Sequence, residues 1–185
     1  MIRTVAFLRA VNVGGHAVVG MSELKRAFVA AGCRHVQTYI QSGNVVFDAP
    51  GGSPAGLFKK IACELDALLG AGALALFRRL SELGNLVQAD PFKEFPAGPD
   101  VKRYVAFLSE PPRRLPQLPL RSQKDELEAI ALKGLEVLIV SRKINGRFGF
   151  PNPFVEKEFG IPATSRNWST IDKIVRLFSH VAPEP

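Results

Sequence analysis

Two short segments in the first half of the chain combine residue types that can bind an anion. The first follows a run of apolar residues and contains Arg9, Asn12 and Gly14-Gly15-His16. Adjacent glycines let backbone N–H groups converge, and a strand, a glycine loop and a helix start can together hold an anion. The segment lacks the Gly-Lys-Ser/Thr of a phosphate loop and the GxGxxG spacing of a dinucleotide site. A plain connecting loop is therefore the competing interpretation.

The second segment is Ser42-Gly43-Asn44, between two runs of β-branched and aromatic residues. Those runs favour strands, and Ser-Gly-Asn tolerates the positive φ of a tight reversal, so the sequence predicts a β-hairpin here. The side chains of Ser42 and Asn44 can serve a ligand, or they can satisfy backbone groups within the turn. Both interpretations are open.

A third candidate pair, Arg166 and Asn167, lies near the end of the chain. A guanidinium fork and an amide can bind a phosphate or a carboxylate. Alternatively, Asn167 or Ser169 caps the helix that follows, while Arg166 pairs with a carboxylate or a carbonyl. Trp168 begins an apolar stripe with Ile171, which predicts that the indole is mostly buried.

A fourth candidate site is basic. Arg142, Lys143 and Arg147 surround Asn145-Gly146, a pair that suits both left-handed positions of a type I′ turn. A basic hairpin tip of this kind can approach the phosphates of a polyanion such as nucleic acid. The chain has a net charge of +7 and a pI of about 9.7. Such a charge attracts polyanions, but it can equally serve only solubility.

The apolar pattern predicts two α+β halves. In the first half a buried strand, a helix capped by Ser22, a hairpin, a second helix and a strand give the order β-α-β-β-α-β of a ferredoxin-like unit. The second half repeats this order in outline, but prolines replace its first helix. We therefore predict an α+β fold of two ferredoxin-like subdomains with antiparallel sheets. The expected boundaries are 1–89, a proline-rich linker at 90–100, and 101–185.

Composition narrows the class of protein. No run approaches the roughly 20 apolar residues of a membrane helix, and no secretory signal is evident, so we expect a cytoplasmic protein that does not contact a membrane. Cys33 and Cys63 have no CxxC spacing and no companion histidines, so neither a metal site nor a cofactor is expected. Cys63 reads as a core residue of a helix, and His35 has no evident partner. The oligomeric state is left open.

Three motifs resemble one bacterial family. They are FLRAVNVGG at 7–15 with Met21 and Leu24 beyond it, TYIQSGNVVF at 38–47, and TSRNWST at 164–170. In this order they resemble domain-of-unknown-function family 1697 over nearly the whole chain. The resemblance implies a duplicated α+β architecture with ferredoxin-like halves in a cytoplasmic bacterial protein. It implies no established activity.

Two functions are compatible with these residues. In the first, the protein is a non-catalytic module that binds an anion or nucleic acid. In the second, it is an enzyme acting on a small phosphorylated or carboxylated substrate, with His16 as acid or base and Arg9 or Arg166 holding the anion. No nucleophile-base pair supports the second. For a shared small-ligand site, the candidate residues must converge in space: Arg9, Asn12, Gly14, Ser42, Asn44, Arg166 and Asn167.

Overall fold

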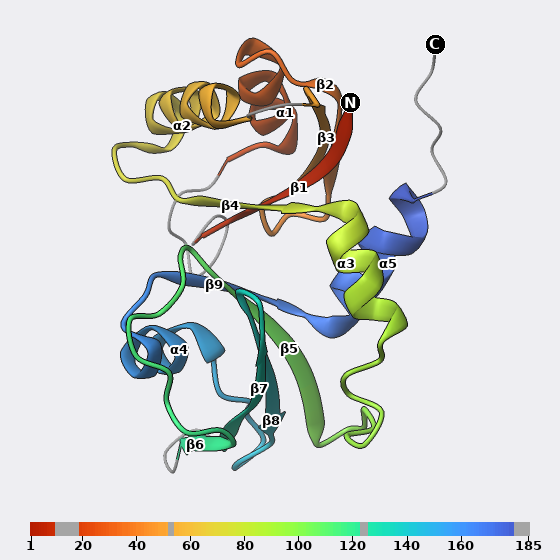
Figure 1. Cartoon of the computed structure of the whole chain (residues 1–185), viewed down its shortest axis with the longest axis vertical. Coiled ribbons are helices and arrows are strands. Elements are labelled where there is room, and N and C mark those ends of the chain that lie inside the picture. Colours follow the sequence, from red (N-terminus) through yellow and green to blue (C-terminus); the bar gives the residue numbers. More distant parts are fainter. Residues whose placement is uncertain (10–18, 52–53, 123–125, 180–185) are drawn as a thin grey trace. The chain divides into compact units, whose positions relative to one another are not determined.

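The computed structural model describes residues 1–9, 19–51, 54–122 and 126–179. The chain forms two compact units. Unit 1 contains Met1–Gly84 and the chain from Arg176, and unit 2 contains Asn85–Val175. Each unit is built around one antiparallel sheet (Figure 1).

Unit 1 has the β-α-β-β-α-β order that the sequence predicts, and its sheet has the strand order β2-β3-β1-β4. Helices α1 and α2 cover one face of this sheet (Figure 1). The elements are β1 (Ile2–Leu8), α1 (Met21–Ala30), β2 (Arg34–Tyr39), β3 (Asn44–Ala49), α2 (Ala55–Leu69) and β4 (Ala75–Arg79), followed by α3 (Leu80–Gln88).

The continuous apolar run of β1 is explained by its place in the sheet. It lies between β3 and β4, so side chains on both of its faces are buried. On the helix-covered face, Leu24 and Phe28 of α1 pack with Ile61 of α2 and with Phe47 of β3. The rings of Phe28 and Phe47 are 5.3 Å apart. This layer forms the core of unit 1.

The start of α1 differs from the prediction that Ser22 caps it. The helix begins at Met21, and Gly20 is its N-cap. Glu23 takes over the capping role, because its Oε2 accepts a hydrogen bond from the Gly20 N–H at 3.0 Å.

Unit 2 has a sheet of order β6-β7-β8-β5-β9, with α4 packed on one face (Figure 1). Helix α4 ends at Gly160, which adopts the left-handed conformation expected of a C-terminal glycine. The elements are β5 (Val101–Leu108), β6 (Leu120–Ser122), β7 (Leu127–Lys133), β8 (Glu136–Arg142), α4 (Pro151–Phe159), β9 (Ala163–Asn167) and α5 (Trp168–Phe178).

The two sheets share one topology. Strands β7, β8, β5 and β9 follow one another in unit 2 as β2, β3, β1 and β4 do in unit 1. The predicted α+β class with two antiparallel sheets is confirmed, as is the loss of the first helix in the second half. The domain boundaries at 1–89, 90–100 and 101–185 stay a prediction. No helix in the described ranges is long and apolar enough to span a bilayer.

Candidate anion site

The end of β1 lies beside the Ser-Gly-Asn turn in unit 1. The Leu8 N–H donates to Gly43 O, and the Arg9 N–H donates to Leu74 O, both at 2.8 Å. Phe7 is directly opposite Asn44 in the sheet. The structure therefore brings Arg9, which is exposed, to the same end of the sheet as Ser42 and Asn44.

Asn44 serves the turn itself. Its side chain is fully buried, and its Nδ2 donates to Tyr39 O and to Ser42 Oγ, each at 3.0 Å. Gly43 has a φ of 69°, the positive value that the sequence predicts for this reversal. These contacts favour the turn interpretation of Asn44. The other candidates of the first half, Asn12, Gly14, Gly15 and His16, lie outside the described residues.

Arg166 is held within unit 2 by its own strand. It is only 8% exposed, and its Nη1 donates to Thr164 Oγ1 at 2.9 Å and to Ser165 O at 2.8 Å. Burial lowers the pKa of the guanidinium to about 10, so Arg166 stays charged at neutral pH. These contacts give it a structural role in β9. Its convergence with Arg9 of unit 1 stays a prediction.

Asn167, by contrast, is exposed at a cavity of 260 Å³ in unit 2. Strand β9 pairs with β5 only from Tyr104 to Leu108, and the chain then turns into α5. The first residues of β5 therefore extend past the end of β9, and the cavity lies beside them. It is lined by Ala97, Val101, Lys102, Arg103, Asn167, Trp168 and Ser169.

The lining of this cavity suits an anion. Its lining residues include a lysine, an arginine, an asparagine and a serine, and no acidic residue. The first residues of α5 also belong to it, and a helix start favours negative charge. Aromatic rings flank both cations: Lys102 Nζ is 4.2 Å from the centre of the Phe148 ring, and Arg103 Cζ is 5.9 Å from that of Phe92.

The predicted basic hairpin lies at the same end of the sheet as this cavity. Val101, the first residue of β5, is paired with Arg142, the last residue of β8. Beyond Arg142 the chain reverses at Asn145-Gly146, with φ values of 47° and 78°. A bridge between Ile144 and Arg147 closes the reversal. These values agree with the predicted type I′ turn.

Two of the three hairpin cations have acidic partners. Arg142 Nη1 lies 2.9 Å from Glu128 Oε2, and Lys143 Nζ lies 3.5 Å from Asp100 Oδ1. Burial of Glu128 opposes its ionisation, but hydrogen bonds from Arg121 and Arg142 outweigh burial and hold the pKa of this carboxyl below its ordinary value.

Arg147 and Lys102 are exposed and Arg103 is half-buried, and in the described part of the chain none of the three has a carboxylate partner. We define the basic surface of unit 2 as Lys102, Arg103, Arg142, Lys143 and Arg147.

Sequence reasoning missed Lys102 and Arg103. The available signal was two adjacent cations at the start of the apolar run that forms β5. Only the pairing of β5 with β8 brings these cations to the same end of the sheet as the hairpin. It was also wrong about His35, whose Nδ1 lies 2.8 Å from Asp48 Oδ2. Asp48 also binds Arg3 of β1. Cys63 is exposed rather than buried, because it lies on the solvent side of α2.

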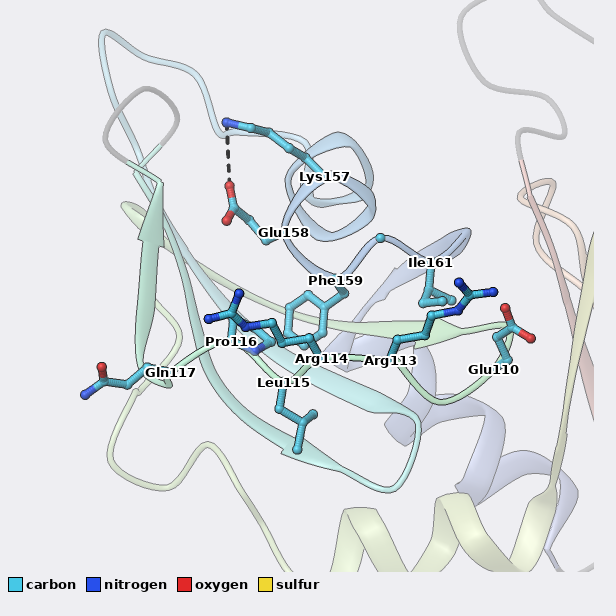
Figure 2. A pocket seen from close by; sticks show the side chains of 11 residues that line it. Glu110, Arg113, Arg114, Leu115, Pro116, Gln117, Lys157, Glu158, Phe159 and Ile161 are labelled. Atoms are coloured by element: carbon cyan, nitrogen blue, oxygen red, sulfur yellow. Dashed lines mark ion pairs between the residues drawn. The ribbon is translucent and has the colours of Figure 1, made fainter.

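A cleft larger than this cavity lies elsewhere in unit 2, and none of the predicted residues lines it. It lies between residues 110–117 and the end of α4 (Figure 2). Across the ranges that the structure covers, no cluster of three or more His, Cys, Asp or Glu side chains could hold a metal ion.

The topology and the site together define an α+β protein with two related antiparallel sheets and a basic surface on the second. Residues 1–137 match the family described as "Protein of unknown function (DUF1697)", and the chain belongs to this family. The fold is similar to that of the conserved bacterial protein SP0830 from Streptococcus pneumoniae. The TM-score is 0.65 at 19% identity, over 95% of this chain and 98% of that one. No curated protein matches.

Proposed function

We propose that this protein is a non-catalytic cytoplasmic module that binds a polyanion, namely the phosphate backbone of single-stranded nucleic acid, at the basic surface of unit 2. One observation carries the proposal: the cavity beside Asn167 contains cations and no carboxylate, and it lies at the same sheet end as the hairpin. A phosphate can sit in the cavity while neighbouring phosphates reach Arg147.

The acidic partners limit which cations contribute. Glu128 and Asp100 already offset Arg142 and Lys143. We therefore expect Lys102, Arg103 and Arg147 to make most of the phosphate contacts. Three contacts to a single strand predict that log K falls with log[salt] with a slope of about −2.

The test is fluorescence anisotropy with a labelled oligothymidylate of about 20 nucleotides, which is longer than a typical single-strand site. Lys102→Glu should weaken binding and make the salt slope shallower by about 0.7 or more. Lys133→Glu is the matched control, because Lys133 is an exposed strand lysine at the other end of the same sheet.

Equal losses in the two variants would mean that only net charge matters. Absence of binding at low salt would remove the proposal altogether. Inorganic phosphate as competitor separates a small-anion site from a strand-binding surface, since a small-anion site predicts complete displacement at millimolar phosphate.

A further inference from the structure

A second cleft of unit 2 is separate from the basic surface. Its volume is 620 Å³, and it runs between residues 110–117 and the end of α4 (Figure 2). A volume of this size is typical of sites that bind a ligand. It is lined by Glu110, Arg113, Arg114, Leu115, Pro116, Gln117 and the chain 157–161.

The cleft occurs where unit 2 lacks a helix. In unit 1 the connection from β1 to β2 contains α1, which packs against α2. The corresponding connection in unit 2 leads from β5 toward β7 and contains Pro111, Pro112, Pro116 and Pro119. Prolines at this spacing exclude a helix, and an extended chain is much thinner than a helix with its side chains. Space beside α4 is left unfilled.

The backbone beside the cleft is free to bind a partner. Within the described residues, no hydrogen bond involves 110–119, whereas the flanking Leu108 and Ser109 N–H groups are both bonded. Prolines contribute carbonyl groups without N–H groups, so acceptors outnumber donors along this segment. An extended peptide could supply N–H donors to these carbonyls, as in other peptide-binding grooves.

The charge at the cleft is uneven. Arg113 and Arg114 are exposed and have no carboxylate partner among the residues that the structure describes. Lys157 and Glu158 lie 3.6 Å apart and offset each other. In Figure 2 the two arginines extend to opposite sides of Phe159, a core side chain that is only 4% exposed. Leu115, which lines the same cleft, is 64% exposed, so cations and an accessible apolar side chain occur together here.

We propose that this cleft binds an acidic peptide segment of a partner protein. Carboxylates of the peptide would meet Arg113 and Arg114, an apolar side chain would pack against the exposed Leu115, and backbone N–H groups would pair with the open carbonyls. A nucleic-acid strand fits less well, because its sugar-phosphate backbone has no N–H donors for these carbonyls.

Three labelled peptides of about ten residues test this proposal. Each has leucine at alternate positions, and the remaining positions are all glutamate, all glutamine or all lysine. We expect the glutamate peptide to bind the full chain at least about tenfold more tightly than the glutamine peptide, and the lysine peptide not to bind. Backbone NMR shifts should change at 113–117 and 157–161.

The variant R113E/R114E should lower affinity for the glutamate peptide by about tenfold or more, whereas K93E/K133E, which reverses two exposed lysines of the same unit, should leave it nearly unchanged. Equal binding of the glutamate and glutamine peptides, or shifts confined to residues outside the cleft, would overturn the proposal. So would displacement of the peptide by oligothymidylate with shifts at the same residues, since the cleft would then be a polyanion groove.

Discussion

The two units use the same strand order but cover their sheets differently. In unit 1, α1 and α2 together cover one sheet face, and their apolar side chains form a continuous layer with Phe47. Among the described residues of unit 2, α4 is the one helix that packs on the corresponding face, and a proline-rich segment stands where unit 1 has its other helix. Two sheets of the same topology can therefore differ in how much of one face is covered by helices. The connection after the central strand decides this, because it contains a helix in unit 1 and prolines in unit 2.

The largest expected effect on the free energy of unfolding concerns Trp168 of unit 2. Its packing does not require a helix in the place where unit 1 has α1. It is 7% exposed, and its ring lies 5.2 Å from that of Phe92. Trp168→Ala should lower the free energy of unfolding by about 3 to 5 kcal/mol in urea denaturation. Phe150→Ala is the control, because Phe150 is 55% exposed and its loss should cost less than about 0.5 kcal/mol. Similar losses in both would place Trp168 outside the core.

The next prediction compares the buried carboxylates of the two units. Asp48 binds Arg3, whose side chain is only 14% exposed, whereas the partners of Glu128 are 73% and 42% exposed. Asp48→Asn leaves a buried guanidinium without its counter-charge, and Arg3 Nη1 already lacks a hydrogen-bond partner. We expect a loss of about 3 kcal/mol for Asp48→Asn and about 1 kcal/mol for Glu128→Gln. Equal losses would contradict this account.

The pH dependence of stability follows from the same carboxyl. Burial opposes ionisation of Asp48, but Arg3 and His35 outweigh it, so its pKa in the folded protein lies below the ordinary value. The ion pair therefore contributes fully above the ordinary aspartate pKa of about 4, and its contribution is lost as the pH falls through the lower folded value. Asp48→Asn should flatten the stability profile below about pH 4. An unchanged profile would mean that other carboxyl groups dominate acid unfolding.

A pair of glycine substitutions is expected to have smaller effects, of opposite sign in the two units. Gly146 has a φ of 78° in the basic hairpin, while Gly56 lies in α2, and a Cβ at either position meets no atom within 4 Å. Gly146→Ala should destabilise by about 1 kcal/mol through backbone strain alone. Gly56→Ala should stabilise by up to about 1 kcal/mol, since alanine favours helix. Thermal unfolding measures both, and stabilisation by Gly146→Ala would exclude the left-handed turn.

The sequence predicted what depends on local patterns. The apolar run of β1, the glycine at the end of α4 and the Asn145-Gly146 turn all follow from spacing and residue type, and each is present. The location of the candidate anion site depends instead on the register between β5 and β8. Lys102 meets the hairpin only because Val101 pairs with Arg142, and no local pattern contains that information.

The same limit explains the errors. The pairing of His35 with Asp48 requires β2 to lie beside β3 in a register interrupted at this position. The large cleft went unpredicted because the prolines indicate only that a helix is missing. They do not indicate that the replacing segment leaves room beside α4.

Backbone NMR of the full chain, titrated with unlabelled oligothymidylate, tests most directly whether the polyanion site belongs to unit 2. We predict shift changes at Ala97, Val101–Arg103, Arg147, Phe148 and Asn167–Ser169, which line the cavity or belong to the hairpin beside it. Signals of Arg9 and Ser42–Asn44 in unit 1 should stay unchanged. Changes at the end of β1 and the Ser-Gly-Asn turn, with none at the cavity of unit 2, would contradict the assignment.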